Sequence, residues 1–150
     1  MAIQSAATSL LAMSGTIFRW DHRISYAQCT VGNHVYHSRY LDILEMARGE
    51  FFRHLGQTCL SWQERDIIFP VIECRLRYKG AARYDDLVTA ELWMTLAEGI
   101  RLTFAGRILD REGRVLVEGE TMHVCTSLHD KPRRLPKELI ATLEPYLAAT

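Results

Sequence analysis

The sequence predicts a single α+β domain in which an antiparallel sheet of five strands wraps around one long helix. One stretch carries apolar residues at helical spacing, and five others alternate between apolar and polar residues. No repeat, low-complexity tract or linker divides the 150 residues. Because a sheet has to bury one of its faces and the long helix is the only large apolar partner, we expect the helix to cover the sheet.

The expected elements follow one another in a simple order. Residues 17–26, "IFRWDHRISY", form the first strand, with alternate residues on one buried face: Phe18, Trp20, His22, Ile24 and Tyr26. After a loop, "YHSRYLDILEMARGEFFRHLG" forms the helix, and Gly56 ends it as a C-terminal cap. A loop through Trp62 leads to four strands that pair antiparallel across short turns such as "DREG", in residues 70–80, 87–99, 100–113 and 114–128. A short helix from Pro136 closes the domain.

Charge and cysteine content exclude several classes of protein. The 18 basic residues equal the 18 acidic residues, so no net field favours nucleic acid or an acidic membrane as a partner. The four cysteines form no CxxC pair, which indicates free thiols in a reducing compartment, and we expect a cytoplasmic protein without a metal site. Residues 1–15 lack the basic segment and the apolar length of a secretory signal, so they are interpreted as a flexible extension of a domain that spans residues 16–150.

Four motifs carry a resemblance to a known family. The stretch "VYHSRYLDILEMARGEFFRHLG" resembles Y-H-x-x-Y-L followed by E-x-A-R-x-E-F in the hotdog-fold acyl-CoA thioesterases of the YbgC and 4-hydroxybenzoyl-CoA thioesterase type, and five residues fall in register: His37, Tyr40, Glu45, Arg48 and Glu50. The resemblance continues in "RYKGAARYDD", "VEGETMHVC" and "KPRRLPKEL", in the same order and at suitable intervals. It covers nearly the whole domain.

The resemblance implies a hotdog fold and hydrolysis of a thioester. It also implies a homo-oligomer built by pairing of sheets, either a dimer or a homotetramer. The acyl group would be carried on coenzyme A or on an acyl carrier protein as part of the substrate, and no separate cofactor is implied. Neither nucleic acid nor a membrane is an expected partner.

One departure from the family bears directly on the chemistry. The family loop Y-x-x-T-D-x-x-G-x-V-Y-H carries an aspartate where this chain has Thr30. A hydroxyl is far too weakly basic to act as a general base, so Thr30 is expected to position a water or to donate to the substrate. A second departure, Ala81 in place of a proline, would alter only the stiffness of a turn.

The start of the helix is the expected catalytic centre. Thioester hydrolysis needs a polarised carbonyl, and a helix N-terminus offers free N–H groups and a favourable dipole to the oxygen that gains negative charge. The backbone around Val35, Tyr36 and His37 is the candidate oxyanion hole, with His37 also lining the site. Gly32, in the preceding loop, is expected among the residues that bind substrate.

Two residues are candidates for the missing base. His34 lies in the loop and has a side chain that titrates near neutral pH. Glu45 lies about 10 Å along the helix from Ser38. The alternative for His34 is a loop histidine that only hydrogen-bonds, and the alternative for Glu45 is an ion pair with Arg48 one turn later.

Four residues are expected to bind the substrate elsewhere. Tyr40 and Arg48 occupy the spacings to which the resemblance points, because the similar enediyne-polyketide thioesterases lack the carboxylate and use tyrosine or arginine groups. The phosphates of coenzyme A favour Lys79 and Arg83. An alternative for the phosphates is a later basic run: Lys131, Arg133, Arg134 and Lys137. For each of these six basic residues, the alternative is a solvated surface charge.

Hydrolysis of an acyl-CoA or acyl carrier protein thioester is therefore the favoured function, with five catalytic candidates: Thr30, His34, Tyr36, His37 and Glu45. The alternative is a protein that binds acyl thioesters without hydrolysing them. A dehydratase is a weaker option, because the D-x-N-P-x-H loop of hotdog dehydratases is absent.

Overall fold

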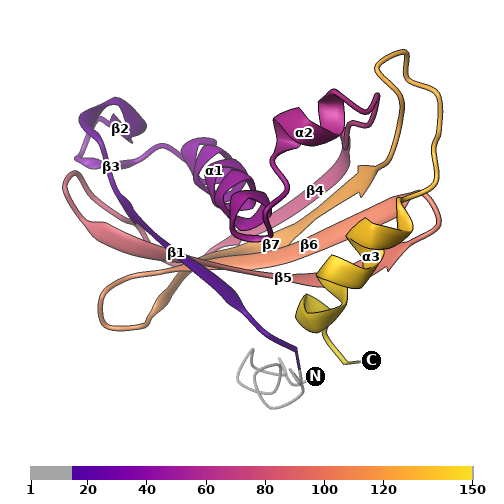
Figure 1. Cartoon of the computed structure of the whole chain (residues 1–150). Coiled ribbons are helices and arrows are strands. Elements are labelled where there is room, and N and C mark those ends of the chain that lie inside the picture. The colour runs from indigo at the N-terminus through magenta and orange to yellow at the C-terminus, as the bar shows by residue number, and fades with distance from the viewer. Residues whose placement is uncertain (1–14, 150) are drawn as a thin grey trace, which may run out of the picture.

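Five strands form one antiparallel sheet, and the long helix lies across its concave face (Figure 1). This computed structural model describes residues 15–149, so the expected extension of residues 1–15 lies almost wholly outside the described residues. The strands pair in the order β1-β5-β6-β7-β4, with these bounds: β1 (Phe18–Arg23), β4 (Val71–Tyr78), β5 (Leu87–Glu98), β6 (Arg101–Leu109) and β7 (Val115–Val124). The predicted α+β architecture of one sheet around one helix is confirmed.

Helix α1 (Arg39–His54) carries the apolar stripe that fills the centre of the domain. Its inward side chains are at most 3% exposed: Tyr40, Ile43, Leu44, Ala47, Phe51 and Phe52. The ring of Phe51 lies 5.3 Å from that of Phe18 and 4.8 Å from that of Tyr146, and burying such a ring is worth about 2–3 kcal/mol. The helix ends as predicted at Gly56, whose φ of +76° lets the N–H groups of Gly56 and Gln57 bind the last carbonyl oxygens of the helix.

Strand β4 lies at one edge of the sheet. It precedes β5 in the chain, but it pairs with β7. Its other side pairs with no strand among residues 15–149, and Val71, Ile72 and Tyr78 are 49–53% exposed. An edge strand of this length with exposed apolar side chains is a natural place for pairing with another chain.

Two expected loops contain short elements, and the first strand is shorter than expected. Strand β1 ends at Arg23 and a 3-10 turn, η3 (Tyr26–Gln28), follows, so Tyr26 is 81% exposed rather than on the buried face. The segment before α1 contains a small hairpin of β2 (Cys29–Thr30) and β3 (His34–Val35). The loop through Trp62 contains helix α2 (Cys59–Gln63), which Thr58 caps by accepting from the N–H of Ser61.

The C-terminal segment completes the core. Helix α3 (Lys137–Leu143) starts after Pro136 as predicted, and the 3-10 turn η4 (Glu144–Tyr146) follows it. Leu139 and Leu143 are fully buried in the same core as α1. None of the helices within residues 15–149 is long and apolar enough to cross a membrane.

The close pairing of β4 with β7 depends on Gly119. A Cβ at Gly119 would overlap the carbonyl oxygen of Arg75, so we expect Gly119→Ala to lower the free energy of unfolding by about 2–3 kcal/mol. Gly49→Ala is the matched control, because a Cβ there meets nothing within 4 Å and a helix interior gains about 0.5–1 kcal/mol from this change. Urea unfolding measures both, and a Gly119→Ala protein as stable as the wild type would contradict the packing described.

Candidate active site

The hairpin of β2 and β3 precedes helix α1 and carries two of the expected site residues. Thr30 pairs with His34 across the hairpin, so their side chains lie close together on one face. Gly32 and Asn33 complete the turn with positive φ angles of 87° and 57°. Val31 at the tip is 94% exposed. The structure therefore brings Thr30 and His34 together at an exposed turn whose shape requires Gly32.

Hydrogen bonds hold the hairpin and the start of α1 against the segment between β4 and β5. The N–H of Val35 donates to the carbonyl oxygen of Ala82 at 2.9 Å, and the N–H of Ala82 donates to the hydroxyl of Tyr40 at 2.9 Å. The N–H of Tyr36 donates to the carbonyl oxygen of Gln28 at 3.0 Å. Tyr40 is thus a core residue, only 2% exposed, and burial raises the pKa of its hydroxyl.

The backbone N–H groups at the start of α1 fall into two sets. Those of Val35 and Tyr36 are already bound, as described above. Among residues 15–149, no acceptor binds the N–H groups of His37 and Ser38. Tyr78 donates its hydroxyl to the carbonyl oxygen of His37 at 3.1 Å, and this bond polarises the peptide unit that ends in the N–H of Ser38. The free donors at the helix start are therefore the backbone N–H groups of His37 and Ser38. His37 was an expected site residue, whereas Ser38 was not.

Aromatic side chains gather at the start of α1. The rings of Tyr36 and His37 lie 4.3 Å apart, and both side chains are exposed. The ring of Tyr78, the last residue of β4, stands edge-on to that of His37 at 6.3 Å. Sequence reasoning placed Tyr36 and His37 here but missed Tyr78, which comes from a strand remote in the chain.

An apolar groove runs along α1 beyond the helix start. It has a volume of about 590 Å³ and lies between α1, the segment after α2, and strands β4 and β7. Its residues from α1 extend from Leu41 to Phe52 and include Glu45 and Arg48. Much of its wall is apolar, including Phe52, Ile67, Ile68, Phe69 and Phe104. The groove brings together Glu45 and Arg48 of the expected residues, whereas Tyr40 faces the core.

A chain of hydrogen bonds orients Arg48 within this groove. Arg48 Nη1 donates to Thr121 Oγ1 at 3.3 Å, Thr121 Oγ1 lies 2.9 Å from His123 Nε2, and His123 Nδ1 lies 2.9 Å from the carbonyl oxygen of Phe69. A carbonyl oxygen only accepts, so we assign the proton of His123 to Nδ1. Nε2 then accepts from the hydroxyl of Thr121, whose oxygen accepts from Arg48. Thr121 and His123 are each 4% exposed.

Burial also sets the protonation of this chain of residues. Burial, with a smaller contribution from the nearby Arg48 and against the bond to Phe69, lowers the pKa of His123 to about 4, so the imidazole is neutral near pH 7. Burial lowers the pKa of the Arg48 guanidinium from its ordinary value, and Glu45 opposes that change. Arg48 still carries its charge at neutral pH.

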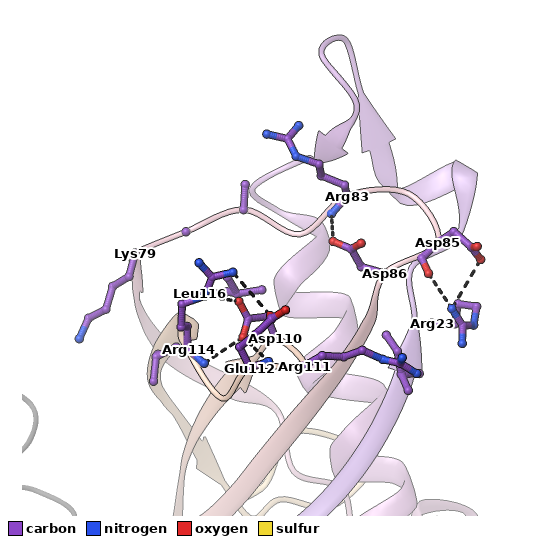
Figure 2. Close-up of a pocket in the computed structure, with 14 residues that line it drawn as sticks. Arg23, Lys79, Arg83, Asp85, Asp86, Asp110, Arg111, Glu112, Arg114 and Leu116 are labelled. Carbon is purple, nitrogen blue, oxygen red and sulfur yellow. Dashed lines mark hydrogen bonds and ion pairs between the residues drawn. The ribbon is translucent and has the colours of Figure 1, made fainter.

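A second cavity, of about 670 Å³, lies where the connections β4–β5 and β6–β7 meet (Figure 2). Charges of both signs line it: Arg23, Lys79, Arg83, Asp85, Asp86, Asp110, Arg111, Glu112 and Arg114. Several of them pair with one another, such as Arg114 with Asp110 at 2.7 Å and Arg23 with Asp85 at 3.7 Å. These pairs leave the cavity only weakly basic.

The two expected phosphate ligands differ in their roles at this cavity. Arg83 Nη1 donates to the carbonyl oxygens of Gly32 and Asn33 at 3.2 and 3.3 Å, so it links the cavity to the hairpin. Lys79 pairs with Glu118 at 2.7 Å and points away from the other labelled side chains in Figure 2. The alternative basic run of residues 131–137 lines neither cavity.

Thr121 and His123 are the main residues that sequence reasoning missed. Both fall at inward positions of a strand that was predicted correctly, in register with the buried Val117. Polar residues at inward positions of a strand are uncommon and must be hydrogen-bonded, so this placement was the available signal. Within residues 15–149, no three histidine, cysteine, aspartate or glutamate side chains gather as a metal site requires.

The neutral His123 makes stability depend on pH. Its pKa is about 4 in the folded protein against an ordinary 6.5, so the unfolded chain binds more protons between these values. The stabilisation is complete above about pH 6.5 and is lost as the pH falls toward about 4, by about 3 kcal/mol in total. In His123→Gln this component is absent, so urea unfolding should show its stability approaching that of the wild type as the pH falls. Parallel stability curves would contradict the buried neutral imidazole.

Comparisons with known proteins agree with this geometry. The model of the thioesterase-like superfamily matches residues 24–143. The acyl-CoA thioester hydrolase YbgC of Escherichia coli O6:H1 is 35% identical over 130 residues, which cover 86% of this chain and 97% of that protein. The acyl-CoA thioesterase YbgC of Haemophilus influenzae is 33% identical, over 83% of this chain and 92% of that protein.

A solved structure shares the fold described above. The crystal structure of a probable thioesterase from Bartonella henselae superposes with a TM-score of 0.76 at 27% identity, covering 81% of this chain and 100% of that chain. The sequence match spans the hairpin, α1 and every strand except β1. The chain therefore belongs to the thioesterase-like superfamily of hotdog proteins.

Proposed function

We propose that the protein hydrolyses acyl thioesters of coenzyme A or of an acyl carrier protein. One observation carries the proposal: the unbound N–H groups of His37 and Ser38 lie at the start of α1, between a hairpin with Thr30 and His34 and an apolar groove. These donors and the helix dipole would stabilise the negative charge that grows on the thioester oxygen. The names of the related proteins from Escherichia coli and Haemophilus influenzae support the same reaction.

The attacking water lies beside Thr30 in this proposal. The hydroxyl of Thr30 holds the water, and His34, its cross-strand partner, takes the proton as the oxygen attacks the carbonyl carbon. The carbon–sulfur bond then breaks, and the protonated His34 returns its proton to the leaving thiolate, which is released as the thiol. Glu45 is the alternative base, because it lies in the groove one to two turns into α1.

The remaining parts of the substrate have distinct places. The groove along α1 takes the acyl chain, because its wall is apolar and it begins one turn from Ser38. The charged cavity takes phosphate of the carrier, with Arg83 as the nearer ligand because it also contacts the hairpin. Lys79 would contribute by exchanging its partner Glu118 for phosphate.

Thr30 itself favours one other function. Because no carboxylate stands at this position, a protein that binds acyl thioesters without hydrolysing them would keep the groove and the free N–H groups unchanged. All four cysteines are free, and the cytoplasmic location expected from them stays a prediction.

A second copy of the chain completes the groove in this proposal. Val71 and Cys74 of the edge strand β4 line the groove, and the outer side of β4 is open for antiparallel pairing. We therefore expect at least a dimer, and a homotetramer where two dimers join. Sedimentation equilibrium checks this, and a mass of 17.2 kDa in dilute solution would contradict it.

Thiol release from a panel of acyl-CoA and acyl carrier protein thioesters tests the function. We expect turnover by the wild type, and a fall in kcat of about 100-fold in His34→Ala because the general base is lost. His129→Ala, a change at an exposed histidine far along the chain, serves as the control and should keep full activity. A large loss in Glu45→Gln with none in His34→Ala would assign the base to Glu45.

Thr30→Asp tests where the water lies. A carboxylate at this position would supply a stronger base, so kcat should rise, whereas Thr30→Asn, which has the same shape without the charge, should show no gain. Absence of turnover on every substrate by the wild type would remove the enzymatic proposal and leave thioester binding.

A further inference from the structure

We propose that Arg48 selects the acyl group, and that the groove favours a medium-length chain with a neutral oxygen, in a hydroxyl or a ketone, toward its far end. This inference rests on the proposed function, because it takes the thioester carbonyl to lie at the N–H groups of His37 and Ser38. It goes beyond that function by naming the class of acyl group.

The guanidinium of Arg48 is a hydrogen-bond donor held inside the groove. Its Nη1 donates to Thr121 Oγ1, and none of the ion pairs among residues 15–149 includes Arg48. A guanidinium has five N–H donors in a rigid fork, so most of them have no protein acceptor within the described chain. In a wall that is otherwise largely apolar, an oxygen on the ligand complements these donors.

The two residues behind Arg48 offer no hydrogen-bond donor of their own to a ligand. The hydroxyl of Thr121 gives its proton to His123, and His123 gives its own to the carbonyl of Phe69, so neither side chain has a proton left for a ligand. Their burial fixes the position of the Thr121 oxygen and with it the direction of the guanidinium.

The charges around Arg48 favour a neutral oxygen over a carboxylate. Asp42 and Glu45 also line the groove, and Arg48 is its only lysine or arginine. Asp42 is paired with Arg39 at 3.0 Å, outside the groove's lining, which leaves Glu45 as the carboxylate that faces Arg48. The remaining ionisable groups of the wall are the thiols of Cys59 and Cys74 and the neutral His123. Glu45 and Arg48 therefore balance each other in the groove, so a carboxylate on the ligand would leave one negative charge without a partner, whereas a hydroxyl or ketone adds no charge.

Helix geometry sets the distance between the two ends of the acyl group. Arg48 lies ten residues after Ser38, roughly 15 Å along the axis, and a helical side chain leans back toward the N-terminus by up to a turn. The guanidinium therefore lies roughly 10–15 Å from the free N–H groups. An extended chain advances roughly 1.2 Å per bond, so the oxygen belongs roughly 8–12 bonds beyond the carbonyl.

The test compares matched substrates. For the wild type, we expect kcat/KM for 10-hydroxydecanoyl-CoA to exceed that for decanoyl-CoA by about tenfold, because the hydroxyl reaches Arg48. Butanoyl-CoA and 3-hydroxybutanoyl-CoA form the control pair, since their oxygen lies too close to the carbonyl to reach it, and their ratio should stay within about threefold.

Two variants separate selection from a general effect. Arg48→Met keeps an unbranched side chain without donors and should abolish the preference for the long hydroxylated substrate. Arg53→Met changes an exposed arginine of the same helix, paired with Glu50, and should leave both ratios unchanged.

The outcomes distinguish this inference from the proposed function. Equal kcat/KM for the two long substrates in the wild type, or a preference that survives Arg48→Met, overturns the role of Arg48 while hydrolysis stands; the wild-type ratio decides even where the variant does not fold. If no substrate releases thiol, hydrolysis fails, and calorimetry with the thioethers decyl-CoA and 10-hydroxydecyl-CoA tests the selection by itself. A Kd about tenfold lower for the hydroxylated thioether supports it, and equal Kd values overturn it.

Discussion

Both backbone polar groups of Ala82 are hydrogen-bonded, one to strand β3 and the other to the first turn of α1, and the position of the candidate site depends on these two bonds. The carbonyl oxygen accepts from Val35, and the N–H donates to the hydroxyl of Tyr40. Ala82 is fully buried, so breaking either bond would leave an unpaired group shielded from water, which costs about 1–3 kcal/mol. The hairpin, the first turn of α1 and the β4–β5 connection are therefore held together, and Arg83 adds bonds to the hairpin carbonyls.

The same helix then serves two purposes at separate points along its length. Its start offers free N–H groups to a developing negative charge, while its middle presents one guanidinium inside the groove. A histidine with an ordinary pKa behind that guanidinium would place a second partial positive charge in the wall. Burial keeps His123 neutral instead, so the side chain orients Thr121 and Arg48 without repelling the arginine.

Sequence patterns predicted the long elements because a helix or strand with one buried face repeats its apolar residues at a fixed spacing. The stripe of α1 and the four later strands follow from the positions of apolar residues, and the cap at Gly56 follows from the positive φ that glycine adopts readily. Short elements were missed because two-residue strands and single turns are too short to show a period: β2 and β3 pair over two residues each, and Tyr26 is exposed because the chain turns after Arg23. The motif likewise identified Tyr40 without revealing that its hydroxyl accepts a hydrogen bond from the N–H of Ala82, which lies 42 residues away in the chain.

The neutral residue at Thr30 changes the electrostatics of the proposed reaction as well as its base. A carboxylate on the hairpin would lie near the start of α1 and offset part of the positive end of the helix dipole. With Thr30 there, the free N–H groups of His37 and Ser38 would act on the oxyanion without that opposing charge, and the bond from Tyr78 to the carbonyl oxygen of His37 strengthens the N–H of Ser38 as a donor. Stabilisation of the oxyanion and removal of the proton from water are then assigned to different groups. The first depends on the backbone at the start of α1, which no side-chain replacement at Thr30 removes. The second falls to the side chain of His34, the cross-strand partner of Thr30.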